Sequence, residues 1–253
     1  MKLQDSVIAI TGGGQGLGRA MAEFLAAKGA RLALIDLMDD KLAESADACK
    51  KAGGDARTYL CNVAKEDDVE KTFQAIINDF GQLNGLVNNA GILRDGLMVK
   101  FRDGKLEKRM ELSQWQSVID VNLTGVFLCG REAATRMIEN GDQGVIINIA
   151  SISRAGNMGQ SNYSAAKAGV SALVPVWAKE LARYGIRCMG IAPGFIETEM
   201  TASMKPEALE KMTAGIPLKR MGKPEEIASA VAFILENDYV SGRMIEVDGA
   251  LRL

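Results

Sequence analysis

The sequence predicts an α/β protein in which a doubly wound parallel sheet of about seven strands carries helices on both faces. Short apolar runs such as residues 7–10 are continuous rather than alternating, which is typical of strands buried on both faces of a parallel sheet. These runs alternate regularly with longer amphipathic segments, and that order favours parallel pairing. With 253 residues and no linker-like stretch, the chain is expected to form one domain, residues 1–253.

The first strand, residues 7–10, leads into a glycine turn at 11–18 and a helix at 19–28. Glycines let the backbone approach a pyrophosphate closely, and free N–H groups at a helix start stabilise its charge. The spacing is Gly-x-x-x-Gly-x-Gly, and an ordinary strand-to-helix loop remains the alternative. The turn residues we predict to contact a dinucleotide are Gly12, Gln15, Gly16, Leu17 and Gly18.

The second strand, residues 31–35, ends at Asp36. This residue follows the glycine turn by about 20 residues, where dinucleotide sites place an acid for the adenosine ribose. A carboxylate accepts hydrogen bonds from both ribose hydroxyls and repels a 2′-phosphate, and Gln15 adds no positive charge to offset one. The sequence therefore predicts NAD(H) over NADP(H), although an Asp in this place could simply cap a turn.

The fourth strand ends in Asn88-Asn89-Ala90-Gly91, at the carboxyl edge where open α/β sheets bind ligands. A polar turn is the alternative. Residues 92–112 then break the pattern with turn residues and mixed charge, so we predict an exposed excursion. The intervening helices and strands are expected at residues 38–52, 56–61, 65–79 and 85–87.

A long helix resumes near Ser113 and carries Asn122 among apolar residues. Because Asn has poor helix propensity, we predict a specific hydrogen bond or a helix distortion there. Ser151 follows the fifth strand at another ligand-edge position. The remaining elements are expected as a strand at 145–149, a helix to about 184 that contains Pro175, a strand at 187–191, a flexible segment to about 222, a helix from Pro224 and a strand at 244–247.

Tyr163 and Lys167 are four residues apart, so on one helix they share a face. An ammonium beside a phenol favours the phenolate, and we predict that Lys167 lowers the pKa of Tyr163 from about 10 toward working pH. Tyr163 is then a candidate general acid and base. Taken alone, Tyr-x-x-x-Lys is more often an ordinary surface pair, and only its context favours catalysis.

Composition excludes several classes of function. The 30 basic and 32 acidic residues leave a net charge of −2, which gives no electrostatic reason to expect nucleic acid or an anionic membrane as partner. The absence of histidine excludes Ser-His-Asp chemistry and imidazole zinc sites, and we predict no metal. The four spaced cysteines are interpreted as buried thiols. No apolar run approaches the ~20 residues of a membrane span, so a cytoplasmic protein is expected.

Taken together, the motifs resemble the short-chain dehydrogenase/reductase family over nearly the whole chain, which implies a Rossmann fold. Within that family the chain is most similar to the 3-oxoacyl-acyl-carrier-protein reductase branch, through residues 91–95, 162–169 and 192–200. The family signals occur in the expected order: Thr11-Gly-x-x-x-Gly16-x-Gly18, Asn88-Asn89-Ala90-Gly91, Asn122, Ser151, Tyr163-x-x-x-Lys167 and Pro193-Gly194.

The resemblance implies a role for each catalytic candidate. Tyr163 would exchange a proton with the substrate oxygen, and Ser151 would hydrogen-bond that oxygen. Lys167 would hold the nicotinamide ribose, and Asn122 would position a water in a proton relay toward it. Nicotinamide would carry the hydride. Further cofactor contacts are implied for Asp36, Asn62, Val63, Asn89, Ala90, Gly91, Tyr163, Lys167, Pro193, Gly194, Ile196 and Thr198.

Three departures from the family pattern bear on the substrate. Asn62 stands where the family usually has Asp, and residues 94–112 form an insertion near the active-site entrance. Asp142 and Tyr184 occupy about the places where carrier-protein reductases are expected to have arginines. Together with Asp36, Asp142 and Tyr184 disfavour reduction on a carrier protein and favour an NAD(H)-dependent enzyme that oxidises an alcohol or interconverts 3-hydroxyacyl and 3-oxoacyl thioesters on a free carrier such as coenzyme A.

Two alternatives stay open. An NAD-dependent dehydrogenase of a polyol, steroid or cyclic alcohol would share every catalytic residue and differ only in the substrate loops, about residues 92–112 and 194–222. A non-catalytic dinucleotide-binding subunit is disfavoured, because an idle site has no chemical need for all four catalytic candidates. The resemblance also implies a homotetramer acting on a small-molecule or acyl-thioester substrate.

Overall fold

The computed structural model describes residues 1–197, 207, 210 and 213–252. Within these residues a seven-stranded sheet is parallel throughout, with the order β3-β2-β1-β4-β7-β8-β9. The predicted fold class is therefore confirmed. The strands are β1 (Val7–Thr11), β2 (Arg31–Asp36), β3 (Asp55–Leu60), β4 (Gly85–Asn88), β7 (Gly144–Ile149), β8 (Ile186–Pro193) and β9 (Met244–Val247).

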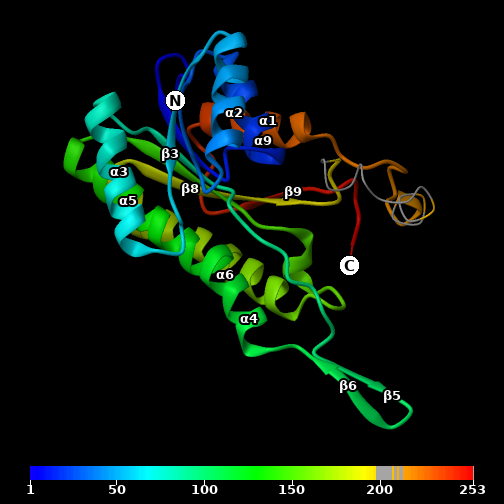
Figure 1. Cartoon of the computed structure of the whole chain (residues 1–253). Helices are drawn as coiled ribbons and strands as arrows, with labels where there is room; N and C mark the ends of the chain where they lie inside the picture. Colours follow the sequence, from blue (N-terminus) through cyan, green and yellow to red (C-terminus); the bar gives the residue numbers. More distant parts are fainter. Residues whose placement is uncertain (198–206, 208–209, 211–212, 253) are drawn as a thin grey trace.

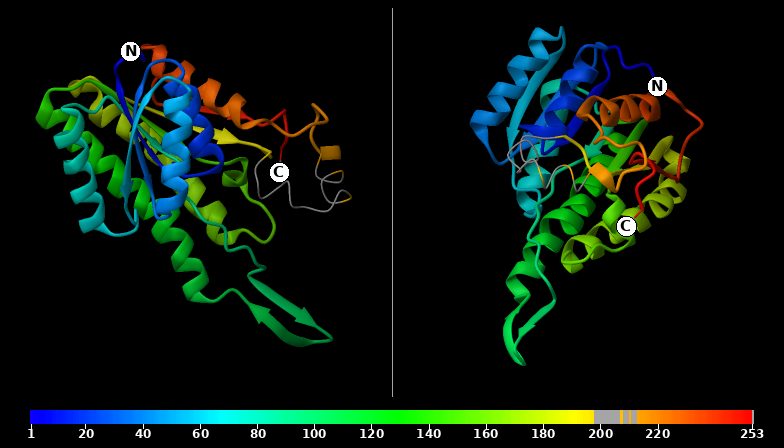
Figure 2. Two further views of the ribbon diagram at one scale, coloured as in Figure 1. Left: turned by 45° about the horizontal axis from the view of Figure 1, so that its top comes forward. Right: turned by 90° about the vertical axis from the view of Figure 1, so that its right-hand side faces the viewer.

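Helices cover both faces of this sheet (Figures 1 and 2). One face carries α1 (Gly16–Ala26), α2 (Asp39–Lys51) and α9 (Pro224–Glu236). The opposite face carries α3 (Glu66–Phe80), α5 (Gly125–Asn140) and α6 (Ser161–Leu181), and α6 continues through Pro175. The remaining helical segments are α4 (Leu112–Ile119), the π-helical turn η1 (Asp120–Thr124) and the short 3-10 turns η2 (Ile152–Ala155) and η3 (Ala182–Tyr184).

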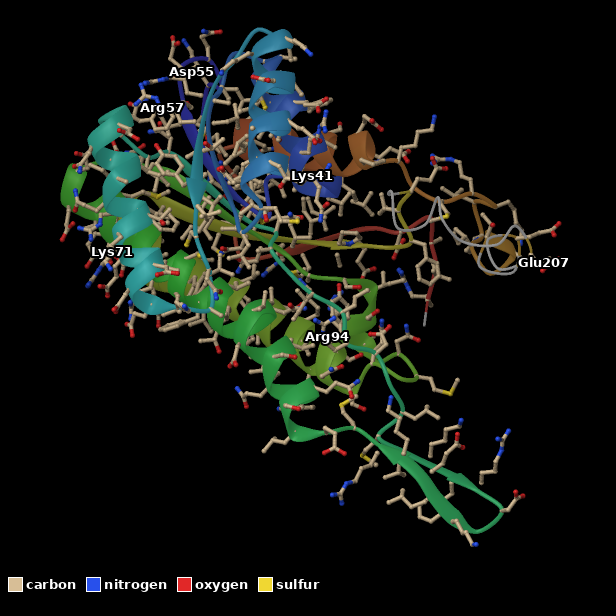
Figure 3. All side chains as sticks on the ribbon, viewed as in Figure 1. Lys41, Asp55, Arg57, Lys71, Arg94 and Glu207 are labelled. Carbon is tan, nitrogen blue, oxygen red and sulfur yellow. The ribbon has the colours of Figure 1, made fainter. Side chains whose placement is uncertain are left out.

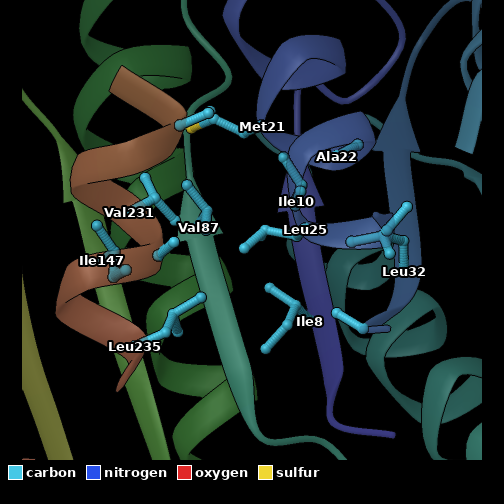
Figure 4. Packing of buried hydrophobic residues seen from close by; sticks show 14 of the residues in the cluster. Ile8, Ile10, Met21, Ala22, Leu25, Leu32, Val87, Ile147, Val231 and Leu235 are labelled. Atoms are coloured by element: carbon cyan, nitrogen blue, oxygen red, sulfur yellow. The ribbon is translucent and has the colours of Figure 1, made fainter. Parts of the chain in front are cut away.

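The continuous apolar runs are explained by two cores that share the sheet. In β1, Ile8 and Ile10 pack under α1 and α9 (Figure 4), whereas Val7 and Ala9 pack toward the opposite helices. Full burial of one such aliphatic side chain contributes roughly 1.5–3 kcal/mol. All four cysteines are buried and free, as predicted: Cys49 lies in the first core, and Cys61, Cys129 and Cys188 lie in the second.

Strand order reverses between β1 and β4. The chain goes from β1 outward to β2 and β3 on one side and then returns to place β4 on the other side of β1. In doubly wound sheets, ligands bind outside the carboxyl ends of the strands at this switch point. The glycine turn follows β1 and the Asn88-Asn89-Ala90-Gly91 segment follows β4, so the topology brings the two motifs to the same edge.

The excursion predicted at residues 92–112 is largely exposed, as expected, and part of it has regular structure. It contains an antiparallel hairpin of β5 (Val99–Arg102) and β6 (Lys105–Arg109), and every residue of both strands is exposed. The turn between them is Asp103-Gly104, with φ of 49° and 74°. Two consecutive positive φ values match a type I′ turn, which suits the twist of a hairpin. We call residues 97–111 the arm, and it projects away from the rest of the fold (Figure 1).

Candidate active site

The glycine turn is built for close backbone approach. A Cβ on Gly18 would lie 1.9 Å from the carbonyl oxygen of Gly12, so α1 can start this close to β1 only with glycine there. Gly16 has φ of 55°, and a Cβ on it would meet no protein atom within 4 Å. Gln15, the exposed N-cap residue, makes no side-chain cap. The free N–H groups and positive dipole end of α1 therefore fit the pyrophosphate of a dinucleotide.

Asp36 lies beside this turn, at the end of β2. Its Oδ2 accepts a hydrogen bond from the Gly14 N–H at 3.1 Å. Its Oδ1 accepts from the N–H groups of Leu37 and Met38 at 2.7 and 3.3 Å. These bonds hold the carboxylate at the rim of the glycine turn, and its remaining lone pairs are suited to accept from ribose hydroxyls.

The segment after β4 is tied to the glycine turn through Thr11. The Thr11 hydroxyl accepts hydrogen bonds from the N–H groups of Asn89 and Ala90, each at 3.0 Å. The Asn89 amide donates to the carbonyls of Thr11 and Gly12, both at 3.1 Å. In this way the two predicted motifs meet at the switch point. Asn89 acts here as a brace between two loops, a role that the sequence analysis did not foresee.

Asn122 shows both features predicted for it. It lies fully buried in the π-helical turn η1, which distorts the run from α4 to α5. Its Oδ1 accepts from the Ile92 N–H at 2.8 Å, and its Nδ2 donates to the Ile92 carbonyl at 3.0 Å. Gly91 sits directly against this amide, because a Cβ there would be 3.4 Å from Oδ1. The side chain of Asn122 therefore fixes the backbone that follows β4.

Ser151, Tyr163 and Lys167 come together at the carboxyl end of β7. Ser151 caps η2 with its hydroxyl, which accepts from the Ser153 N–H at 3.1 Å, and it also hydrogen-bonds the phenol of Tyr163. Lys167 is only 4% exposed, and its Nζ donates to the Ile149 carbonyl at 2.7 Å. The same Nζ lies 5.6 Å from the centre of the Tyr163 ring. Two neighbouring hydroxyls thus lie at the end of β7, with a buried amine beside the Tyr163 ring.

The predicted lowering of the pKa of Tyr163 by Lys167 is not what the structure shows. Burial raises the pKa of Tyr163, and this effect outweighs the hydrogen bond with Ser151, which lowers it; the charge of Asp95 raises it further. Burial likewise lowers the pKa of Lys167 from 10.5 to about 8. The physical reason is that desolvation favours the neutral form of each group, so the phenol stays protonated.

The residues predicted near the adenine lie at the end of β3. Asn62 forms a local turn in which its Oδ1 accepts from the Ala64 N–H at 3.0 Å. A carbonyl oxygen has a second lone pair, so this bond still leaves room for an amino donor. The Val63 side chain is buried in the second core, close to Gly125. Any contact of Val63 with a dinucleotide would therefore come from its main chain.

The end of β8 forms the remaining part of the predicted cofactor site. Gly194 follows Pro193 and donates its N–H to the Val247 carbonyl at 2.9 Å. Ile196 bridges to Gly222 and lines a cavity of about 310 Å³. Thr198 lies outside the described residues, as does most of the predicted substrate loop up to residue 212.

Three residues that the sequence analysis did not assign to the site hold the loops around Tyr163. Asn162 is fully buried, and its Nδ2 donates to the carbonyls of Arg94 and Gln114 at 2.9 and 3.3 Å. Gln114 also donates to the Arg94 carbonyl at 2.7 Å. Asp95 accepts from Gln160 at 2.9 Å, two residues before Asn162. The sequence signal for these contacts was the asparagine directly before the candidate tyrosine.

In the part of the chain that the structure describes, no group of three or more Cys, Asp or Glu side chains is arranged to hold a metal ion. None of the helices described there has the length and apolar character needed to cross a bilayer. The Asp142 carboxylate, at a predicted departure from the carrier-protein pattern, accepts from the Leu83 N–H and from Asn140 at 2.9 and 2.8 Å. It is thus engaged within the chain.

Comparison with known proteins extends these observations. A family model described as enoyl-(acyl carrier protein) reductase matches residues 12–251. The 3-oxoacyl-[acyl-carrier-protein] reductase of Homo sapiens is 42% identical over 98% of this chain and 99% of its own length, and that of Thermotoga maritima is 38% identical over 99% of both. The crystal structure of NAD+-bound xylitol dehydrogenase matches with a TM-score of 0.88 and 27% identity, over 99% of this chain and 100% of that one.

These matches run from the glycine turn through the helix of Tyr163 to the last strand, over the same loops that the structure brings to one edge of the sheet. Their extent leaves no large part of the chain outside the comparison. We conclude that the chain belongs to the short-chain dehydrogenase/reductase family.

Proposed function

We propose that this oxidoreductase uses NAD(H) to interconvert a secondary alcohol and a ketone, with a 3-hydroxyacyl/3-oxoacyl thioester as the first candidate substrate. The observation that carries the proposal is the neighbouring hydroxyls of Ser151 and Tyr163 with the buried amine of Lys167 beside the Tyr163 ring. The thioester is favoured by relatives named as 3-oxoacyl-[acyl-carrier-protein] reductases at 38–42% identity. A homotetramer and a cytoplasmic location stay predictions from the family resemblance.

The chain's own residues supply the proton and hold the carbonyl. Nicotinamide, when bound, supplies the hydride in reduction and accepts it in oxidation. Ser151 and Tyr163 donate hydrogen bonds to the substrate oxygen, and Tyr163 transfers its proton as negative charge develops there. Its raised pKa suits the role of acid in reduction. Lys167 has its amine beside the Tyr163 ring and is placed to hold the ribose hydroxyls. The proton relay through Asn122 stays a prediction.

The preference for NAD(H) rests on Asp36. The carboxylate is held at the rim of the glycine turn by three backbone N–H groups. A 2′-phosphate placed there would meet a negative charge, whereas two ribose hydroxyls would find an acceptor. The proposal of coenzyme A rather than a carrier protein follows from this preference. Asp142 and Tyr184 do not add to it within one chain, because they precede β7 and β8 at the opposite edge of the sheet from Ser151 and Tyr163.

A polyol or cyclic alcohol is the second candidate substrate. It is favoured by the structural match to NAD+-bound xylitol dehydrogenase, which shares the fold over the full chain. Both candidates place the reacting oxygen on Ser151 and Tyr163. Enzymes for the two candidate substrates would differ in the loops around the rest of the substrate, so turnover measurements are needed to distinguish the candidates.

The test begins with fluorescence titration of NADH and NADPH against the wild-type protein and the Asp36→Ser variant. NADH should bind at least tenfold more tightly to the wild type, a difference of about 1.4 kcal/mol. The variant should lose most of that preference. NADPH bound more tightly by the wild type would contradict the assignment of Asp36.

Turnover of 3-oxoacyl-coenzyme A, xylitol and a cyclic ketone with the preferred cofactor then ranks the substrates. A kcat/KM for the thioester at least tenfold above the others is the expected result. If xylitol has the highest kcat/KM, the second candidate function replaces the first. If NADH binds tightly but none of the three substrates is turned over, the result supports a non-catalytic dinucleotide-binding subunit.

A further inference from the structure

Among the described residues, the arm is a feature that the proposed function does not use: the sequence analysis placed it in a substrate loop, but it projects away from the rest of the fold. Its two strands pack closely on each other and on no other described element to a comparable extent. Figure 3 shows the side chains of the arm standing clear of the other elements. A lone two-stranded hairpin is at best marginally stable in water. We therefore expect another surface to pack on the arm.

The register gives the hairpin two different faces. Phe101 pairs with Leu106, and Val99, two residues before Phe101 on the same side, pairs with Arg109, so this face is largely apolar with one cation at its end. The opposite side has like charges in direct cross-strand pairs, Lys100 with Lys108 and Arg102 with Lys105. Like charges opposite one another are destabilising unless water screens them. The bulge places Glu107 within 2.8 Å of Lys100, which neutralises one of the four cations. One face of the hairpin is thus charged and suited to water, and the other is largely apolar and suited to contact with an apolar surface.

The apolar face of the hairpin is exposed: Val99 (50% exposed), Phe101 (63%) and Leu106 (51%). Leu97 (44%), Met98 (68%) and Leu112 (76%) are further exposed apolar side chains that flank the hairpin. If each of these side chains buries roughly 100 Å², two arms related by a twofold axis bury about 1,200 Å² before the receiving surfaces are counted, which reaches the range of stable interfaces. A contact used twice by symmetry is therefore large enough to hold two protomers.

Charge also favours a second copy of the chain over other partners. The arm contains five basic and three acidic residues, whereas the whole chain contains 30 basic and 32 acidic residues. The body that remains is therefore more acidic than the chain as a whole. A cationic arm and an acidic body in the same molecule attract each other between copies.

We propose that the arm is an association element, whose apolar face packs on the body of a second copy of this chain while its cationic face remains in water. This inference goes beyond the proposed function, because it concerns a surface that no catalytic step uses. It assigns the exposed Phe101 and Leu106 to a protein interface and the four opposing cations to solubility and to the choice of partner.

The base of the arm is joined to the site that holds Tyr163. The Gly96 N–H donates to the Gly159 carbonyl at 2.7 Å, and Gly96 forms an isolated bridge with Gln160. Gln160 is the N-cap of α6, three residues before Tyr163. A contact that fixes the arm therefore also restrains the loop from which the catalytic helix starts.

Sedimentation velocity over a range of protein concentrations tests the proposal. Wild-type protein is compared with a double variant of the apolar face, Phe101→Ser with Leu106→Ser. The matched control changes the cationic face of the same two strands, Lys100→Ser with Lys108→Ser. NADH titration of each protein reports whether the dinucleotide site is folded.

We expect the wild type to form assemblies larger than the 27.1 kDa chain. The apolar-face variant should lose one association step or weaken it at least tenfold, whereas the control, which removes only part of the long-range attraction between arm and body, should weaken it by less than about threefold. Equal association of the apolar-face variant and the wild type would overturn the proposal. So would a wild type that stays at the mass of one chain at micromolar concentration.

Hydrogen exchange of the wild type provides a second measurement that does not depend on any variant. Amides of β5 and β6 should exchange at least tenfold more slowly at high protein concentration than after dilution to the dissociated state. Exchange that does not change with concentration would contradict an interface at the arm. Cosedimentation of the protein with anionic lipid vesicles tests a lipid surface as the alternative occupant. If the wild type cosediments, the cationic-face variant does not, and all three proteins self-associate equally, the arm binds lipid instead.

Discussion

At the scale of single residues, the site is dominated by the cost of placing charge in a dry environment. Lys167 is 4% exposed and holds its Nζ on the Ile149 carbonyl, and burial lowers its pKa to about 8. Tyr163 beside it has a raised pKa for the same reason. At neutral pH the Tyr163 phenol is therefore protonated and uncharged, whereas Lys167 is still mostly an ammonium but closer to its titration than an exposed lysine, so the two do not form a standing ion pair.

Removal of the Tyr163 hydroxyl should greatly slow the proposed reaction without preventing dinucleotide binding. For Tyr163→Phe we expect kcat to fall by about 10²–10⁴, the usual contribution of a general acid. The affinity for NADH should stay within about threefold of wild type, since each factor of ten corresponds to about 1.4 kcal/mol. The fully exposed Tyr239→Phe is the matched control. Wild-type turnover in Tyr163→Phe would remove the catalytic assignment.

Lys167 should also leave a signature in the pH dependence of stability. Between the folded pKa of about 8 and the unfolded value of 10.5, the unfolded chain keeps a proton that the folded chain has lost, so wild-type stability rises with pH. A Lys167→Met variant lacks this rise. Its free energy of unfolding relative to wild type should therefore fall by up to about 3 kcal/mol from pH 7 to 10.5. Urea unfolding of both proteins across this range measures the difference, and a constant difference would contradict the burial argument.

At the scale of elements, the run from α4 through η1 to α5 shows how one polar residue shapes a helix. The π-helical turn carries Asn122 inward, where its amide satisfies both the N–H and the carbonyl of Ile92. Single-turn π-helical insertions disturb the regular ladder and occur often at functional sites. The turn thereby connects the helix layer with the loop that follows β4.

The amide of Asn122 should therefore matter to stability as well as to catalysis. Replacement by Ala leaves the Ile92 N–H and carbonyl without partners, and we expect a loss of about 2–4 kcal/mol in the free energy of unfolding. Gln116→Ala, which removes an exposed hydrogen bond to Asp120 on the same helical run, should change it by less than about 0.5 kcal/mol. Chemical denaturation measures both. Equal effects of the two substitutions would show that Asn122 is not a structural brace.

How far the sequence predicted the elements depended on whether the signal was local. The buried strands were predictable because continuous apolar runs need burial on two sides, and Asn122 because it fits a helix interior poorly. The arm had a local signal too, Asp103-Gly104 between Val99, Phe101 and Leu106, but mixed charge concealed the alternation. The contacts of Asn162 with Arg94 and Gln114 join segments far apart in the chain, so no local pattern could predict them.

At the scale of the whole molecule, two cores share a single sheet as their common wall. The core beneath α1 and α9 and the core beneath α3, α5 and α6 receive alternate residues of the same strands. Loss of one core removes the support of the strands that form the other. The chain should therefore unfold as one cooperative unit.

Two core substitutions, one on each face, test this cooperativity. Leu25→Ala in the first core should lower the free energy of unfolding by about 2–5 kcal/mol, and Phe73→Ala in the second by about 3–5 kcal/mol. In each variant urea should give one transition by both fluorescence and circular dichroism. The double variant should be additive within about 0.5 kcal/mol, because the two side chains are separated by the sheet. Two separate transitions in either single variant would show that the cores unfold independently.

The burial of every cysteine has a practical consequence for chemistry performed on this protein from outside. Burial raises the pKa of Cys49 and Cys188 to about 12, and raises the pKa of Cys61 and Cys129 as well, so at neutral pH hardly any thiolate is available to an alkylating reagent. The chain has no histidine that could compete for such a reagent. A cysteine introduced on the surface would therefore carry the label alone, and a fluorophore or spin probe could be attached at one chosen site while all four natural thiols stay in place.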